Sequence, residues 1–74
     1  MKYTGSADEH IKVGGSFYGY AWFETEDGKE IAVAFKVGRY ELVKSPIWNW
    51  IEKSRTAEEQ QYIEDHFEQM QAMF

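Results

Sequence analysis

Two stretches in the first half of the chain have the composition of β-strands, but their hydrophobic patterns differ. Residues 29–37 alternate aliphatic or aromatic positions with small or charged ones, which is the pattern of a half-buried strand. Residues 17–25 begin with FYGYAWF and so place aromatic side chains on both faces of any strand. The Asp27-Gly28 pair between them is typical of a tight hairpin turn, so we expect the two strands to pair antiparallel.

A two-residue turn centred on this pair fixes which side chains share a face. It places Trp22 opposite Val33. Two residues further along each strand, Tyr20 faces Phe35. A second turn, in the sequence VGRY, continues the meander and places Phe35 opposite Leu42. The two turns agree on one apolar face, which we expect to form the core. Its members are Tyr18, Tyr20, Trp22, Ile31, Val33, Phe35, Val37, Tyr40 and Leu42.

The other face of the aromatic strand is predicted to lie open. It carries Phe17, Ala21 and Phe23, beside Ala32 and Ala34 of the next strand. We expect the helices on the opposite face, so this shallow apolar surface is predicted to bind a partner or a second copy of the chain. Two alternatives stay open. Residues 1–13 fold across this face, or a turn of different length exchanges the two faces.

The second half of the chain changes to a helical period. Ser45-Pro46 predicts the start of a short helix with the sequence IWNWIEKS. Thr56 and Glu59 have the spacing of a capping box and predict a long helix over residues 57–73. One stripe of that helix is apolar, as in a helix that packs on a core. The stripe consists of Ile63, Phe67, Met70 and Phe74, and Tyr62 and Met73 widen it.

The expected fold is a single α+β domain over residues 1–74. A small antiparallel β-meander of three or four strands comes first. The short helix and the long C-terminal helix follow and pack on one sheet face. Residues 1–8 are polar or small and are expected to be flexible, and residues 9–13 are expected to form a short edge strand or one helical turn.

Charge and composition narrow the classes of function. The chain has 13 acidic and 8 basic residues and a net charge of −5. Binding to a phosphate backbone needs a basic surface, so direct binding of nucleic acid is not expected. The sequence has no cysteine and no apolar run long enough for a membrane span or a signal peptide. We therefore expect a cytoplasmic protein without disulfide bonds.

Residue types that carry out catalysis are present, but not in a known arrangement. His10 and His66 have no metal-ligand spacing, and no serine lies in a nucleophile elbow. The paired carboxylates lie at a hairpin tip, where no contrast of environment separates an acid from a base. We expect no catalytic residue, metal, cofactor or enzymatic activity. The aromatic ladder of Tyr18, Tyr20 and Trp22 keeps single-stranded nucleic-acid binding as a lesser alternative, since the basic residues are scattered.

Acidic side chains gather in two places. The cluster at the hairpin tip contains Glu24, Glu26, Asp27 and Glu30. The cluster on the outer face of the long helix contains Glu58, Glu64, Asp65 and Glu68. Solubility alone explains such clusters on a solvated surface. The functional hypothesis is that their spaced negative charge imitates a nucleic-acid backbone and binds a basic groove of another protein.

The chain thus joins an antiparallel meander, FYGYAWFETEDGKEIAVAFKVGRYELV, to an acidic helical tail, SPIWNWIEKSRTAEEQQYIEDHFEQM. This plan resembles that of small phage and mobile-element proteins that block host defence, including anti-CRISPR inhibitors. These proteins share no motif, so the resemblance assigns no residue. It implies a non-catalytic inhibitor that binds a basic nucleic-acid-binding effector in the cytoplasm of the host cell. The alternative is a structural or adaptor subunit that self-associates, for instance as a homodimer, through the apolar sheet face.

Overall fold

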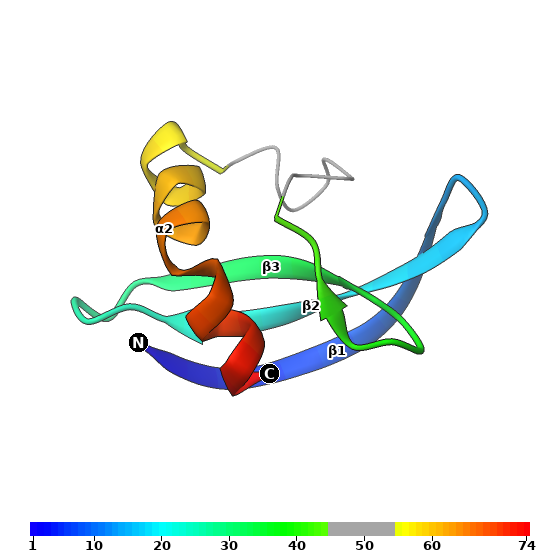
Figure 1. The fold of residues 1–74 in the computed structure, drawn as a ribbon, viewed down its shortest axis with the longest axis horizontal. Coiled ribbons are helices and arrows are strands. Elements are labelled where there is room, and N and C mark those ends of the chain that lie inside the picture. The colour runs from blue at the N-terminus through cyan, green and yellow to red at the C-terminus, as the bar shows by residue number, and fades with distance from the viewer. Residues whose placement is uncertain (45–54) are drawn as a thin grey trace.

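The structure, a computed structural model, describes residues 1–44 and 55–74. Its elements are β1 (Lys2–Val13), β2 (Ser16–Glu24), β3 (Glu30–Lys36), β4 (Glu41–Leu42) and α2 (Ala57–Met73). The four described strands form one antiparallel sheet in the order β1-β2-β3-β4. The sheet is curled, and α2 lies on one of its faces (Figure 1). The α+β class is therefore confirmed, while the short helix expected after Ser45 lies outside the described residues.

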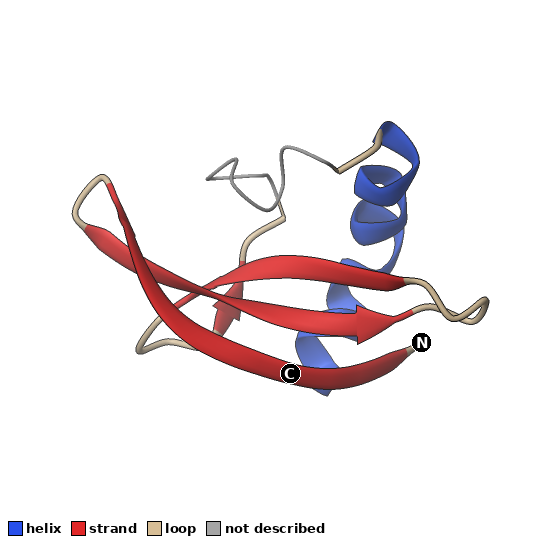
Figure 2. Ribbon diagram, turned by 180° about the vertical axis from the view of Figure 1, so that it is seen from behind, coloured by secondary structure: helices blue, strands red, loops and turns tan. Residues whose placement is uncertain are grey.

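The β1–β2 hairpin turns at Gly14 and Gly15. These glycines have φ values of 58° and 89°, as the two central positions of a type I′ turn require, and Val13 pairs with Ser16 beside them. The strand β1 is long and bends with the sheet (Figure 2). Residues 1–8, which the sequence predicts to be flexible, lie in β1 from Lys2 onward. The first segment therefore extends the sheet beside β2.

The β2–β3 turn differs from the expected two-residue form. The Thr25 N–H donates to the Lys29 carbonyl at 2.8 Å, and the Gly28 N–H donates to the Thr25 carbonyl at 3.0 Å. Gly28 has a φ of 84°, so the turn is a three-residue loop that ends in a left-handed glycine. Phe23 consequently pairs with Ile31. The predicted register was wrong by one residue, and such a shift turns every side chain of β2 to the other face.

The core therefore forms on the odd-numbered face of β2. The buried cluster consists of Ala21, Phe23, Ile31, Val33, Phe35, Leu42, Ile63 and Met70. The predicted open face of Phe17, Ala21 and Phe23 is wrong for the last two, which are 0% exposed because they pack in the core with α2. Phe17, close to the start of β2, is 45% exposed.

The opposite face of the sheet carries the aromatic ladder. Tyr20 is 1% exposed, and Ala34, its partner on β3, is fully buried. Tyr18 and Trp22 are half-buried. The ladder that was predicted to lie under the helices thus lies on the face away from α2.

Aromatic rings close the core near the C-terminal end of α2. The centroid of the Phe35 ring lies 4.7 Å from that of Phe74 and 5.8 Å from that of Tyr40. Gly19 is opposite Phe35 in the sheet. A Cβ at Gly19 would lie 2.8 Å from the Phe35 ring and 2.5 Å from the Ala7 carbonyl oxygen. Glycine is needed in this strand because a ring and a neighbouring backbone occupy the space of a side chain.

The edge strand β4 has the predicted register, with Leu42 opposite Phe35. A side chain of α2 forms hydrogen bonds with the backbone at the outer edge of this strand. The Leu42 N–H donates to Gln71 Oε1 at 2.8 Å, and Gln71 Nε2 donates to the Tyr40 carbonyl at 3.1 Å. One side-chain amide thus satisfies both a donor and an acceptor of the backbone at this edge.

The helix α2 has the predicted bounds and the predicted cap. Thr56 Oγ1 accepts from the Glu59 N–H at 3.1 Å, and Glu59 Oε1 accepts from the Thr56 N–H at 2.9 Å. Ile63 and Met70 are fully buried, as the apolar stripe predicts. His66 has non-helical φ and ψ angles of −119° and 15°, and the helix is kinked there.

Candidate functional site

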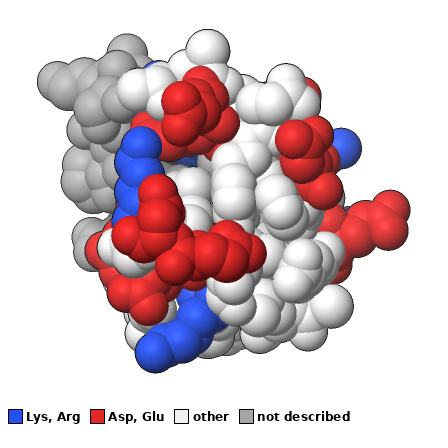
Figure 3. Space-filling view, turned by 90° about the vertical axis from the view of Figure 1, so that its left-hand side faces the viewer, with Lys and Arg blue, Asp and Glu red and all other residues white. Residues whose placement is uncertain are grey.

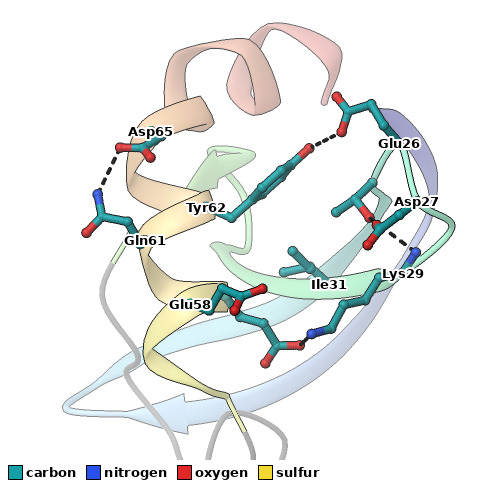
Figure 4. A pocket seen from close by; sticks show the side chains of 10 residues that line it. Glu26, Asp27, Lys29, Ile31, Glu58, Gln61, Tyr62 and Asp65 are labelled. Carbon is teal, nitrogen blue, oxygen red and sulfur yellow. Dashed lines mark hydrogen bonds and ion pairs between the residues drawn. The ribbon is translucent and has the colours of Figure 1, made fainter.

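A groove of about 420 Å³ lies between the β2–β3 turn and the first half of α2 (Figure 4). The hairpin contributes Thr25, Glu26, Asp27, Lys29 and Ile31 to its walls. The helix contributes Glu58, Glu59, Gln61, Tyr62 and Asp65. Burial of Ile63 in the core holds this half of α2 against the sheet. The side chains that flank Ile63 are thereby placed opposite the hairpin tip.

Two side-chain links join the hairpin to the helix across the groove. The Tyr62 hydroxyl donates to Glu26 Oε2 at 3.0 Å, and Lys29 Nζ lies 3.1 Å from Glu59 Oε2. Both links are drawn in Figure 4. The Met1 amino nitrogen also lies 3.3 Å from Glu26 Oε1. These contacts restrict the conformations of the wall side chains before any ligand binds.

The same contacts shift the pKa values of the linked groups. Hydrogen bonds from the backbone and then from Tyr62 lower the pKa of Glu26. The backbone hydrogen bond at Thr56, followed by the bond from Lys29, lowers the pKa of Glu59. The bond to Glu59 in turn raises the pKa of Lys29. Burial, and then the bond to Glu26, raises the pKa of Tyr62. At neutral pH these two carboxylates are therefore ionised and the phenol is neutral.

The groove carries a large excess of negative charge. Among the described residues that line it, five carry a carboxylate and Lys29 carries an ammonium group, while the Met1 amino group lies beside Glu26 at its edge. Only Glu59 is paired with a cationic side chain of the described residues. Asp27 accepts a hydrogen bond from the Thr25 hydroxyl, which is the main cause of its lowered pKa. Figure 3 shows this side of the molecule, with acidic side chains gathered around an uncharged surface.

The floor of the groove is apolar. Ile31 is 4% exposed, and the half-buried Tyr62 ring extends above it toward Glu26 (Figure 4). One face of the Tyr62 ring stacks on His66, with centroids 4.1 Å apart and planes inclined by 25°. The site therefore combines an apolar floor with an acidic rim.

The structure brings together half of each predicted acidic cluster. Glu26 and Asp27 of the hairpin meet Glu58 and Asp65 of the helix at the groove. The other four predicted positions do not line it: Glu24, Glu30, Glu64 and Glu68. The first two of these pair across the sheet at the base of the hairpin, and the last two are exposed on α2.

Sequence reasoning missed the residues that join the two clusters. It assigned Glu59 only to the helix cap, although the same carboxylate also binds Lys29. It placed Tyr62 only at the margin of the apolar stripe. A tyrosine at that margin was the available sequence signal for a contact between the helix and the hairpin. A tyrosine in this position can pack its ring on the core and direct its hydroxyl to a neighbouring element.

Comparisons of the chain with protein-family models, curated proteins and solved structures find no match. Among the side chains that the structure describes, no group of three or more His, Asp or Glu is placed to hold a metal ion. In the same part of the chain no helix has both the length and the apolar character needed to cross a membrane.

Proposed function

We propose that this chain is a non-catalytic binding protein whose acidic groove engages a basic surface of another protein. The observation that carries the proposal is the meeting of the hairpin and helix acidic residues at one groove, whose described lining has five carboxylates and one lysine. Complementary potentials steer partners of opposite charge together. The same potential repels phosphate groups, so the groove favours a basic protein over a nucleic acid.

The arrangement of the groove also favours binding without large reorganisation. Tyr62 holds the carboxylate of Glu26, and the helix cap and Lys29 hold that of Glu59. Ordering side chains at an interface costs about 0.5–1.5 kcal/mol for each flexible group. Side chains that are held before binding lose less conformational entropy, so more of the attraction appears as affinity.

The narrower form of the proposal concerns the kind of partner. A protein that binds nucleic acid carries the basic surface that an acidic groove requires. We take the partner to be such an effector and this chain to be its inhibitor, as in the anti-defence proteins that the organisation of the chain resembles. Nucleic acid and this chain are then expected to compete for the effector.

The surfaces on which the two alternative functions rest are partly buried. Self-association through the apolar sheet face needed Ala21 and Phe23, and both are 0% exposed. Stacking of single-stranded nucleic acid needed the ladder that includes Tyr20, which is 1% exposed. Neither alternative is supported by a specific observation of the described residues.

Affinity capture tests the proposal. The tagged chain is immobilised and exposed to lysates of bacteria that carry CRISPR effectors. Bound proteins are identified by mass spectrometry at low and high salt. A groove variant removes three charges without touching the two links: Asp27→Asn, Glu58→Gln and Asp65→Asn. A matched surface variant removes three exposed charges outside the groove: Glu41→Gln, Glu64→Gln and Glu68→Gln.

The expected result is that the wild type and the surface variant capture a nucleic-acid-binding protein. The groove variant is expected to lose it, and high salt or added nucleic acid is expected to release it, because exposed charges are screened over about 8–10 Å at 0.1–0.15 M salt. Capture that withstands both high salt and the groove variant contradicts the proposal. Loss of capture by the surface variant to the same degree assigns the effect to net charge alone and also contradicts it.

A further inference from the structure

The groove offers two kinds of contact at once. Ile31 and the Tyr62 ring form its apolar floor. Asp27, Glu58 and Asp65 line it without an ion pair to any side chain of the described residues. A ligand that satisfies both parts has an apolar stem and a cationic head. Arginine and lysine side chains have this structure, and they commonly bury the stem while the charged end remains at the surface.

Lys29 already supplies one cationic group to the groove, and its charge also acts on Glu58 and Asp27. Its ammonium group pairs with Glu59 at one side of the groove, while the Tyr62–Glu26 link closes the other side (Figure 4). The space of about 420 Å³ next to these links falls within the range of about 300–1,000 Å³ found for small-ligand sites. A second cationic side chain therefore has room in the groove without displacing Lys29.

We propose that this space seats one arginine side chain of the partner protein. Its stem lies over Ile31, and its guanidinium group lies beside the Tyr62 ring and binds the carboxylates of Asp27 and Glu58. The inference rests on the proposed function and adds the residue type by which the partner is recognised. A guanidinium group is planar, stacks on aromatic rings and bonds carboxylates in a bidentate manner. The stacking of Tyr62 on His66 holds the ring in position for this contact.

Titration with short peptides, followed by ¹H–¹⁵N NMR of the full chain, tests the inference. The probe is acetyl-Gly-Arg-Gly-amide, and its lysine and citrulline counterparts serve as comparisons. The arginine peptide is expected to shift the amide signals of Ile31, Glu58 and Tyr62. The lysine peptide is expected to bind about two- to five-fold more weakly, because it loses the planar stacking contact. The citrulline peptide keeps the shape without the charge and is expected to cause no saturable shift.

Variants locate the contact. The groove variant is expected to weaken binding of the arginine peptide by about five-fold or more, and the surface variant to change it by less than about two-fold. Tyr62→Leu is expected to bind about two- to five-fold more weakly than Tyr62→Phe, which keeps the ring and loses only the hydroxyl. Equal weakening by the groove and surface variants overturns the inference. So does equal binding of the citrulline peptide, or a shift pattern centred outside the groove.

Failure of this inference and failure of the proposed function give different results. If a basic protein is captured through the groove but the arginine peptide leaves the groove signals unchanged, the proposed arginine contact is wrong. The proposed function is then retained. If the peptide saturates the groove but no basic protein is captured, the function is wrong, although the groove binds the guanidinium group.

Discussion

Replacement of Gly19 by alanine is expected to destabilise the domain, because two groups already occupy the space of a side chain. The added Cβ would lie 2.5 Å from the Ala7 carbonyl oxygen and 2.8 Å from Cζ of Phe35. The ring end lies on the axis of ring flipping and can move only by rotation about χ1, toward the packed ring of Phe74. The carbonyl belongs to the backbone of β1 and can move only with the strand. Overpacking costs about 1–3 kcal/mol, and the contact with backbone places Gly19→Ala in the upper half of that range.

Urea unfolding followed by tryptophan fluorescence measures this loss. A domain of this size has a total stability of roughly 4–11 kcal/mol, at about 0.05–0.15 kcal/mol per residue. A loss of about 2–3 kcal/mol is therefore a large part of the total. With a slope of about 1 kcal/mol per molar urea, the midpoint is expected to fall by about 2–3 M. The corresponding fall in Tm is about 8–24 °C.

Two further variants control this experiment. Gly14→Asn changes a glycine whose Cβ would meet no atom within 4 Å, and asparagine tolerates its left-handed conformation, so a change within about 0.5 kcal/mol is expected. Combined with Phe35→Leu, Gly19→Ala is expected to cost less than the sum of the two single changes, because the smaller side chain relieves part of the clash. A Gly19→Ala domain as stable as the wild type refutes the close approach of β1 and Phe35 to this position.

Three other predictions follow from the described contacts. Gln71→Leu removes the bonds at the edge of β4 and is expected to destabilise by about 1–3 kcal/mol, with faster hydrogen exchange of the Leu42 amide seen by NMR. Thr56→Ala is expected to cost about 1 kcal/mol in urea unfolding, because the N-cap bond is lost. The pKa of Glu59 lies below its ordinary 4.5, so its contribution to stability is complete above pH 4.5 and is lost as pH falls through the folded pKa. The pKa of Lys29 lies above its ordinary 10.5, so its contribution is complete below pH 10.5 and is lost as pH rises further. Thermal melts across pH check both limits.

The elements that the sequence predicted well are those determined by local chemistry. The long helix begins where Thr56 and Glu59 can cap each other, and both cap bonds form. The face of β2 was predicted wrongly because an Asp-Gly pair suits both a two-residue turn and a three-residue loop that ends in a left-handed glycine. The hydrogen bonds of Thr25 favour the three-residue loop over the two-residue turn. Its hydroxyl accepts from the Lys29 N–H at 3.2 Å and donates to Asp27, which stabilises the longer loop.

The candidate site was predictable only in its parts. Each acidic cluster is visible in the sequence, but their meeting depends on how α2 lies across the sheet. That orientation is set by the burial of side chains such as Ile63 and Met70 against the strands, which are distant in the sequence. The wrong face of β2 also concealed which side of the hairpin the helix would cover. The opposite charges of Lys29 and Glu59 are consistent with the ion pair that joins the hairpin to the helix. The sequence contains many other pairs of opposite charge, so charge alone does not identify this one.

The amide of Gln71 makes the two edges of the sheet unequal. Sheet proteins polymerise when an exposed edge strand templates the backbone of another molecule. At β4 the template is already occupied, since the side chain of Gln71 takes the place of a neighbouring strand at Leu42 and Tyr40. A molecule that adds at β4 must first displace this amide from both groups. Intermolecular growth of the sheet is thus opposed at β4, which leaves β1 as the other edge among the described strands.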